Sequence, residues 1–449
     1  MSYQPHTPAD RQAMLEAIGV ASVEDLFADI PASIANPSLD LPPPLTEPEL
    51  TRLMQQRAAQ NEGARLTCFL GAGAYDHFIP AVVDELAGRG EFYTAYTPYQ
   101  AEMSQGLLQS IYEYQSMICA LTGLEVSNAS LYEAATALWE AILMAERAVP
   151  HSRQVVLDGS LNPRYRAVIQ SYARRVNLSV VEIPPRDGGL DWEAAAAQVQ
   201  VGSSALVVQN PNFFGVVDDY TRAAEMAHAA GALFIMVVNP LSLGLLKTPG
   251  EMGADICVGE GQPLGIPLQF GGPYLGFMAT TRKYIRSLPG RLIGATVDAR
   301  GERGFVMTLR AREQDIRRGR ASSNICTNQA LMALRATLYL ALVGPQGLRE
   351  VAELNLRRAH YLRTRLAELP GFSLPFARPT FNEFVVAGPT DAETILQYLR
   401  QQGFLGGLAL GPYYAGMEHC FLVCCTEQRT REEMDRYIET LHRWARQRP

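Results

Sequence analysis

The middle of the chain alternates between short apolar runs and longer amphipathic stretches. Six apolar runs predict strands, at residues 155–157, 178–183, 205–209, 232–238, 255–258 and 274–279. Stretches with helical spacing separate several of them, at residues 131–148, 165–175 and 221–230. Strand, helix and strand in this order predict a mostly parallel sheet with helices on both faces. Ligands in such sheets bind at the carboxyl ends of the strands.

The region before this pattern, residues 1–62, predicts a helical arm. Thr7 and Pro8 can cap and begin a helix that ends at Gly19, with proline in its favoured first turn. The proline-rich segment 30–48 predicts an extended stretch, because proline is excluded from helix interiors and central strands. Arms of this kind more often wrap a partner subunit than stand free.

The region after the pattern predicts a smaller α+β domain of ordinary size. Helices are expected at residues 330–342, after Gly344-Pro345 as far as residue 365, at 391–402 and at the C-terminus. Strands are expected at 372–374, 384–386 and 421–425. We therefore expect three parts: the arm at 1–62, a large α/β domain at 63–330 and a small C-terminal domain at 331–449.

Composition narrows the class of protein. The 449 residues are 47% hydrophobic and 19% charged, which is typical of a soluble globular protein. A net charge of −7 argues against nucleic acid as a partner. The apolar runs are too short for a membrane span, and the N-terminus shows no secretory signal, so we expect a cytoplasmic protein. The seven cysteines lack metal-site spacing and predict reduced thiols without a metal.

The chain has 37 arginines but only two lysines, Lys247 and Lys283. The stretch from Ala254 to Pro273 predicts a strand, a tight turn and a glycine-rich loop. In pyridoxal-phosphate (PLP) enzymes of the aspartate aminotransferase type, such a stretch carries the lysine that binds the cofactor as a Schiff base. Gln262 stands at the matching position, and its amide cannot form an imine. The sequence thus predicts a PLP-dependent transferase fold, type I, without its covalent anchor.

Two further positions bear on the cofactor. Ser130 and Glu133 form a Ser-x-x-Glu pattern that predicts a capping box at a helix start, where PLP enzymes of this fold bind the phosphate. We expect an ordinary capped helix there. Asn239 ends a buried strand where such enzymes usually keep an aspartate for the pyridine nitrogen, and an amide cannot supply that charge.

Two polar stretches are candidates for a site. Residues 92–106 are rich in tyrosine, threonine and acidic or amide side chains, which suits a site or an interface as well as a packed loop. The run 310–320 has five arginines, which could receive a phosphate, a carboxylate or an acidic protein, or form a solvated face paired with Glu313 and Asp315. The small polar segment 321–327 that follows suits a site wall.

Together these stretches resemble the glycine decarboxylase (P-protein) family of the glycine cleavage system, and within it subunit 1 (α) of members split into two chains. The matching stretches follow one another along nearly the whole chain: Met14-Leu-Glu-Ala-Ile-Gly19, Phe69-Leu-Gly-Ala-Gly73, Tyr96-Thr-Pro-Tyr-Gln-Ala-Glu102, Ser127-Asn-Ala-Ser-Leu-Tyr-Glu133, Gly259-Glu-Gly-Gln-Pro-Leu-Gly265 with Gly271-Gly-Pro273, and Arg312-Glu-Gln314 with Ser323-Asn-Ile-Cys-Thr327.

The resemblance implies an α2β2 heterotetramer in which PLP is held by the β subunit (subunit 2). Glycine reacts there and loses CO2, and the aminomethyl group passes to the lipoyl arm of the H-protein. The α chain would have no catalytic residue of its own and would supply one wall of the partner's site. The residues expected on that wall are Tyr96, Thr97, Tyr99, Gln100 and Glu102, followed by Ser323, Asn324 and Thr327. The arginine run would help to dock the H-protein.

Two other interpretations stay open. The chain could be an autonomous PLP-dependent lyase or aminotransferase that uses Lys247 or Lys283, although neither lysine has the surroundings of a Schiff-base site. It could also be a purely structural subunit, in which case changes in the 96–102 loop would affect assembly but not turnover.

Overall fold

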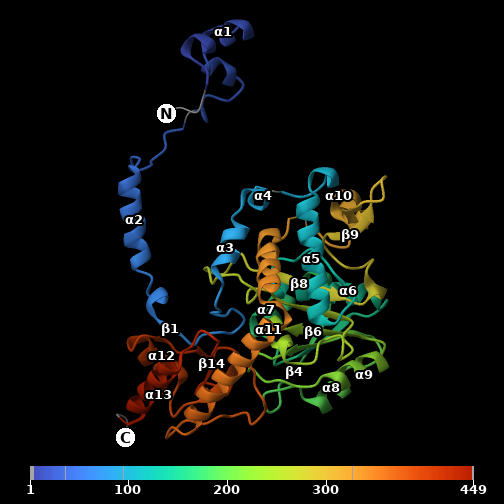
Figure 1. Cartoon of the computed structure of the whole chain (residues 1–449), viewed down its shortest axis with the longest axis vertical. Helices are drawn as coiled ribbons and strands as arrows, with labels where there is room; N and C mark the ends of the chain where they lie inside the picture. The colour runs from blue at the N-terminus through green and yellow to red at the C-terminus, as the bar shows by residue number, and fades with distance from the viewer. Residues whose placement is uncertain (1–4, 36, 95, 326, 447–449) are drawn as a thin grey trace. The chain divides into compact units, whose positions relative to one another are not determined.

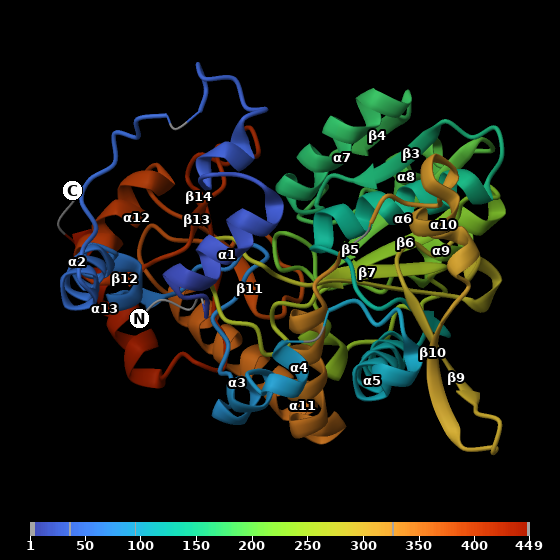
Figure 2. The same ribbon diagram turned by 90° about the horizontal axis from the view of Figure 1, so that it is seen from above.

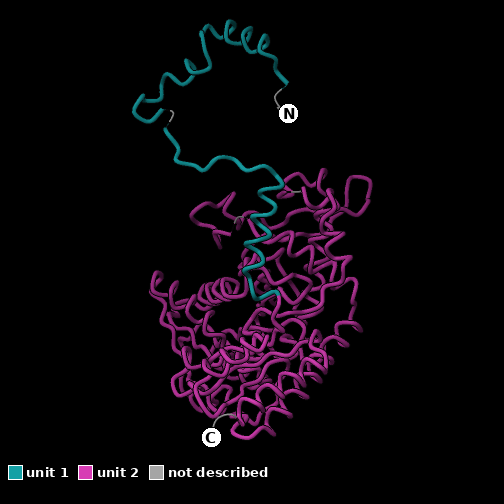
Figure 3. Tube along the Cα trace, turned by 90° about the vertical axis from the view of Figure 1, so that its left-hand side faces the viewer, with its two compact units in different colours: residues 1–64 teal, residues 65–449 magenta. Residues whose placement is uncertain are grey.

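The computed structural model describes residues 5–35, 37–94, 96–325 and 327–446 (Figure 1). The chain divides into two compact units, residues 1–64 and residues 65–449 (Figure 3). The expected boundary near residue 330 does not separate two units in this division and stays a prediction.

The first unit consists of isolated helices joined by extended chain: α1 (Pro8–Ile18), the 3-10 helix η1 (Glu24–Phe27) and α2 (Glu47–Ala59). The predicted start of α1 is confirmed, because Thr7 Oγ1 accepts a hydrogen bond from the backbone N–H of Asp10 at 3.2 Å. The extended segment ends at residue 46, since Pro48 occupies the first turn of α2, where its missing N–H is tolerated. None of the described residues in 5–64 is buried, so this unit has no core of its own.

A seven-stranded sheet organises the second unit. Its order is β2 (Val126–Ser127), β8 (Gly276–Thr280), β7 (Ile256–Glu260), β6 (Leu233–Val238), β5 (Ser203–Asn210), β3 (Gln154–Asp158) and β4 (Ser179–Ile183). Strands β3 to β7 run parallel, whereas β8 and β2 pair antiparallel at one edge. The apolar runs therefore predicted both the strands and the mostly parallel sheet.

Helices cover both faces of this sheet (Figure 2). Ala205 and Val207 of β5 pack in one apolar cluster with α6 (Ala134–Ala148) and α7 (Pro163–Val176). Their neighbours Leu206 and Val208 point to the opposite face, where the second cluster includes residues of α5 (Gln105–Thr122), α8 (Trp192–Gln198), α9 (Thr221–Ala229) and the first part of α11 (Ala330–Ala367). A strand buried on both faces explains the continuous apolar runs of the sequence.

A two-stranded hairpin, β9 (Leu292–Val297) and β10 (Arg303–Thr308), projects beside α5 (Figure 2). Two glutamines of α5 fix its base. The side-chain amide of Gln105 both donates to the carbonyl and accepts from the N–H of Phe305, at 2.8 Å each. Gln115 pairs in the same way with Ile293, at 2.9 Å each. Each glutamine amide thus forms the two reciprocal backbone hydrogen bonds that a residue of a neighbouring strand would form, and these bonds hold the hairpin base on α5.

The C-terminal part contains a three-stranded antiparallel sheet, β11 (Glu383–Ala387), β14 (Cys420–Cys424) and β13 (Leu408–Ala409), packed against α12 (Ala392–Gln401) and α13 (Arg431–Arg446). Nearby, β1 (Thr67–Cys68) pairs in parallel with β12 (Phe404–Leu405). The strand expected at 372–374 is wrong, because only Ser373 forms a bridge there and Pro375 lacks the N–H that would extend it.

Helix α11 runs through the second unit, with one break at Gly344 (φ 61°, ψ −178°) followed by Pro345. By length and composition α11 could cross a membrane, but half of its most apolar window is buried in the protein, as in the core helix of a soluble protein. Residues before the break, and Leu348 shortly after it, pack in the cluster on the seven-stranded sheet, whereas Ala359, Leu362 and Leu366 pack in the C-terminal part.

Candidate functional site

The position that would carry the cofactor's lysine lies two residues beyond β7 and is closed by the chain itself. Gln262 is 1% exposed. Its Oε1 accepts from the N–H of Tyr75 at 2.8 Å, and its Nε2 donates to the carbonyls of Tyr75 at 3.0 Å and Ile266 at 2.8 Å. Every hydrogen-bonding group of this amide except one lone pair is used within the protein.

The start of α6 differs from the predicted capping box. The chain stays extended through the bridge between Leu131 and Gly276, so the helix begins three residues later, at Ala134. Glu133 is itself the N-cap, and its carboxylate accepts from the N–H groups of Ala135 at 2.6 Å and Thr136 at 3.0 Å. Ser130 is buried with a positive φ of 155°, and its hydroxyl has no partner among the described residues. The expected Ser130–Glu133 pair is therefore wrong, although the helix start is capped internally.

A second carboxylate completes this cap. Glu260, the last residue of β7, accepts from the N–H of Ala134 at 3.2 Å, of Gln262 at 3.0 Å and of Leu275 at 2.9 Å. Burial raises the pKa of Glu260 to about 8, and the three backbone donors act against this rise. A phosphate at this helix start would find its amides occupied and two acidic side chains in its place.

Asn239 follows β6 directly. Its Oδ1 accepts from the N–H of Leu241 at 3.1 Å and caps the 3-10 helix η4 (Pro240–Gly244). No carboxylate stands at this position to pair with a pyridine nitrogen. These four positions therefore do not fit PLP. Gln262 offers no amine for a Schiff base, and Glu133 and Glu260 occupy the backbone amides that would bind the phosphate. Asn239 offers no negative charge for the pyridine nitrogen.

The two lysines lie on the surface. Lys247 Nζ pairs with Asp219 Oδ2 at 2.7 Å, with both side chains more than half exposed. Lys283 is exposed and its Nζ lies 4.9 Å from the centre of the Tyr284 ring. Neither has the buried surroundings that a Schiff-base lysine needs, which speaks against an autonomous PLP enzyme.

Three of the eight predicted wall residues line a separate cavity of about 260 Å³. It is bounded by the 92–98 loop, the base of the hairpin, α5 and the first turns of α11. Tyr96, Thr97 and Thr327 line it together, and the hydroxyl of Tyr96 lies 3.3 Å from Thr327 Oγ1. The structure thus brings together two stretches that are 231 positions apart in the chain.

Tyr99 lines an adjoining, smaller cavity. Two guanidinium groups lie over its ring, that of Arg291 at 5.9 Å and that of Arg310 at 5.5 Å from the ring centre. Arg310 also pairs with Asp315 at 2.5 Å. Arg291 lines both cavities and has no ion pair among the described residues, and its positive charge acts on Glu313, which also lines the smaller cavity.

The other predicted wall residues lie outside these two cavities. Gln100 and Glu102 are exposed beside and within the 3-10 helix η3 (Ala101–Met103). The hydroxyl of Ser323 donates to Glu140 at 3.0 Å and accepts from the N–H of Ile325 at 3.2 Å. Asn324 is exposed. Four of the eight predicted wall residues therefore line the two cavities, and the other four lie outside them.

The arginine run divides into paired and free members. Arg310 pairs with Asp315, and the buried Arg312 pairs with Glu313 at 2.9 Å. Arg317, Arg318 and Arg320, the exposed arginine cluster, have no ion pair among the described residues. This cluster leaves three positive charges open to solvent on a chain of net charge −7.

Three residues of these sites were not predicted: Arg291, Glu260 and Tyr75. Arg291 is a single arginine before an apolar strand, a signal too weak to distinguish it from other surface arginines. Glu260 is an acidic residue that ends a buried apolar strand, and such a residue marks a special environment. Tyr75 follows a glycine-rich turn, but its contact with Gln262 joins positions 187 residues apart.

Comparison with known proteins agrees with this fold. The sequence model of the family described as "Glycine cleavage system P-protein" matches residues 1–441. A protein of Geotalea uraniireducens (strain Rf4) named probable glycine dehydrogenase (decarboxylating) subunit 1 is 53% identical over 441 residues, which cover 98% of this chain and 99% of that protein.

Solved structures give the same result. A crystal structure of glycine decarboxylase (P-protein) of the glycine cleavage system, in inhibitor-bound form, matches with a TM-score of 0.92 at 46% identity and covers 99% of this chain and 100% of its own. Sphingosine-1-phosphate lyase of Burkholderia pseudomallei K96243 shares the fold alone, with a TM-score of 0.67 at 14% identity over 93% of this chain and 96% of its own. The predicted PLP-dependent transferase fold, type I, is confirmed, and the chain belongs to the glycine cleavage system P-protein family.

Proposed function

We propose that this chain acts as subunit 1 of glycine dehydrogenase (decarboxylating) and completes a site whose PLP is held by subunit 2. The observation that carries the proposal is Gln262, which replaces the anchoring amine and is bonded to the chain's own backbone. A relative with this subunit name matches over the full length at 53% identity. An α2β2 assembly in the cytoplasm follows from this proposal.

In the assembled enzyme, PLP supplies the electron sink that allows glycine to lose CO2. This chain's part is to bind, orient and exclude water around the reacting groups. The hydroxyls of Tyr96, Thr97 and Thr327 are placed to form hydrogen bonds across the cavity, and the charge of Arg291 attracts a carboxylate or phosphate. Tyr99 holds Arg291 in position through its ring. Gln100, Glu102, Ser323 and Asn324 would form the rim.

The remaining aminomethyl group then passes to the lipoyl arm of the H-protein, which must dock close to the composite site. The exposed arginine cluster suits this role, because unpaired arginines favour an acidic partner and increase its rate of association. A membrane or a nucleic acid is not part of this proposal.

The test uses the complex of this chain with subunit 2. Tyr96→Phe removes the hydroxyl beside Thr327 Oγ1, and Tyr99→Leu removes the ring over which two guanidinium groups lie. Each should lower glycine turnover by about tenfold, the size expected for losing one hydrogen bond or one cation–π contact in a site. Tyr172→Phe removes a hydroxyl from an exposed tyrosine of α7 and is the control, expected to leave turnover unchanged.

Each variant is first shown by size exclusion to assemble fully. Unchanged turnover in assembled Tyr96→Phe and Tyr99→Leu complexes would favour the purely structural interpretation. Decarboxylation of glycine by this chain alone would instead favour an autonomous enzyme.

A further inference from the structure

The segment of residues 71–78, between β1 and α3 (Ala81–Ala87), lies across the carboxyl edge of the seven-stranded sheet. Its first part contacts the connection that follows β3, where Asn162, the N-cap of α7, donates from Nδ2 to the carbonyl of Ala72 at 3.1 Å. Its middle contacts the end of β7 through the reciprocal pair of Tyr75 and Gln262. Strands β5 and β6 lie between β3 and β7, so the segment spans the edge where ligands of this fold bind.

The opposite side of the segment is bonded to the C-terminal part. Glu383, the first residue of β11, accepts from the N–H of Ala72 at 2.6 Å and from the hydroxyl of Tyr75 at 2.8 Å. Glu427 contacts His77 Nδ1 at 2.7 Å and accepts from the N–H of Phe78 at 2.6 Å. Glu383 therefore binds the first half of the segment and Glu427 binds its end, each with two contacts.

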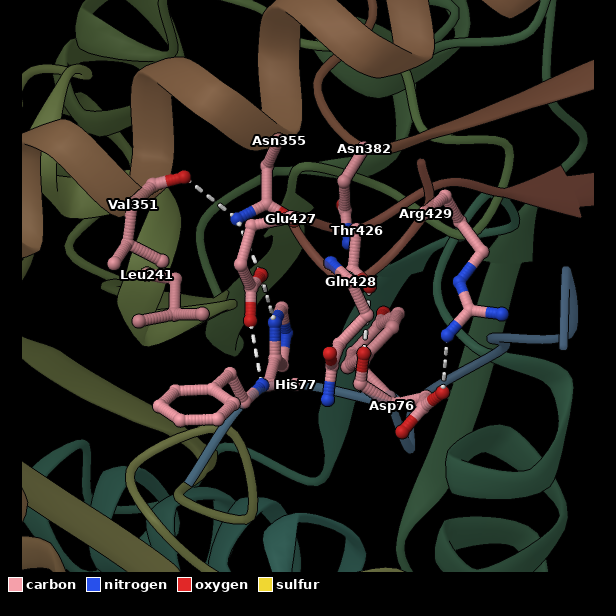
Figure 4. A network of polar contacts seen from close by, with 12 residues as sticks. Asp76, His77, Leu241, Val351, Asn355, Asn382, Thr426, Glu427, Gln428 and Arg429 are labelled. Atoms are coloured by element: carbon pink, nitrogen blue, oxygen red, sulfur yellow. Dashed lines mark hydrogen bonds and ion pairs between the residues drawn. The ribbon is translucent and has the colours of Figure 1, made fainter. Parts of the chain in front are cut away.

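A further set of contacts strengthens this attachment (Figure 4). Arg429 pairs with Asp76 at 2.9 Å, and Thr426 Oγ1 donates to the carbonyl of Asp76 at 2.6 Å. Asn355 of α11 donates to Glu427 at 3.2 Å. Figure 4 shows these side chains converging on the segment from the loop after β14 and from α11.

The packing leaves little space around the segment. A Cβ on Gly71 would lie 2.4 Å from Glu383 Oε1 and 2.8 Å from Cys424 Cβ, and one on Gly73 would lie 3.0 Å from Asn162 Nδ2. Gly73 also has a φ of +112°, which side chains rarely adopt. Tyr75 and His77, in contrast, are buried at 7% exposure each. Small residues thus allow the backbone close to the sheet edge, and two large ones fill the remaining space.

We infer that residues 71–78 are an internal plug: they occupy this subunit's own cofactor pocket and join the seven-stranded sheet to the three-stranded sheet. The pocket then excludes PLP even when a lysine stands at position 262. Loss of the anchor is only one of several changes, because the plug covers position 262 and two carboxylates occupy the phosphate position. The inference concerns the chain's own pocket and does not depend on the wall residues of the proposed function.

The test is to introduce Gln262→Lys in the full-length chain, incubate it with excess PLP, reduce with borohydride and map pyridoxyl groups by mass spectrometry. The chain has only Lys247 and Lys283 otherwise, so the background is small and measurable. Gln269→Lys, in the same glycine-rich loop but partly exposed, is the matched control. We expect labelling at position 262 to stay no higher than at Lys247 and Lys283, and stoichiometric labelling there would overturn the inference.

A second measurement does not require a variant that folds. Hydrogen exchange of the unmodified chain, followed by mass spectrometry, compares peptides from the plug with peptides from β6 and from the hairpin tip at residues 298–302. We expect the plug amides to exchange as slowly as those of β6. Exchange of the plug as fast as the exposed hairpin tip would show that the pocket opens freely and would refute the inference.

Discussion

Replacing Gln262 by leucine tests the energetic weight of the plug directly. The two side chains have similar volumes, so the main change is the loss of three hydrogen bonds of 2.8, 3.0 and 2.8 Å. The N–H and carbonyl of Tyr75 and the carbonyl of Ile266 would be left unpaired beside a side chain that is 1% exposed in the native protein. Each unsatisfied buried group costs about 1–3 kcal/mol. Burying a leucine returns about 2 kcal/mol.

The net expectation is a loss of about 1–7 kcal/mol in the free energy of unfolding. The assay is urea unfolding of the full-length chain, with the slope of the transition compared between variants to check that the same surface is exposed. Gln346→Leu is the matched control, because Gln346 is exposed and, among the described residues, its side chain bonds only to Glu350, one turn further along α11. The control should change stability by less than about 0.5 kcal/mol. An unfolding midpoint for Gln262→Leu within the range of this control would refute the reasoning.

Two other predictions follow from charges described above. Burial raises the pKa of Glu383 to about 7, so between its ordinary value of 4.5 and about 7 the folded chain holds a proton that the unfolded chain releases. The free energy of unfolding should therefore fall as pH rises through this window, by up to about 1.4 kcal/mol per pH unit. In Glu383→Gln, the urea midpoint should depend less steeply on pH. An equally steep pH dependence in the variant would contradict the assignment to Glu383. Reversing the charge of the exposed arginine cluster should raise the apparent KM for H-protein in the subunit 1–subunit 2 complex by about tenfold at low salt without changing kcat. If raising the salt concentration changed the apparent KM for H-protein equally in the charge-reversed and native complexes, this would count against docking at the cluster.

The sheet was predictable because its strands are buried on both faces and so appear as uninterrupted apolar runs. The start of α6 was not, because a Ser-x-x-Glu pattern is also compatible with a bridge that keeps Leu131 extended. Gln262 could be identified from its surroundings in the sequence as the replacement for a lysine. Its partner Tyr75 could not, since nothing in either local sequence specifies a pairing across 187 positions.

The wall residues show the same limit. Tyr96 and Thr97 were predictable from the density of polar and aromatic residues in their loop, and Thr327 from the small polar segment that contains it. Arg291 became visible only when the hairpin base brought it against Tyr99. Local composition thus indicated two of the segments that line the cavity, and tertiary contacts decided which of their side chains face it.

Helix α11 connects the two regions that matter in this subunit. Its first turns, including Ala330 and Met332, form part of the wall cavity, and Asn355 in its second half bonds to the Glu427 segment that anchors the plug. A helix is stiff along its axis, so the only place where these halves can change their relative direction without breaking helical hydrogen bonds is the non-helical Gly344. The first turns of α11 at the cavity are therefore positioned by a helix whose second half is bonded to the segment that holds the plug. A substitution at Gly344 would change the shape of the cavity although Gly344 does not line it.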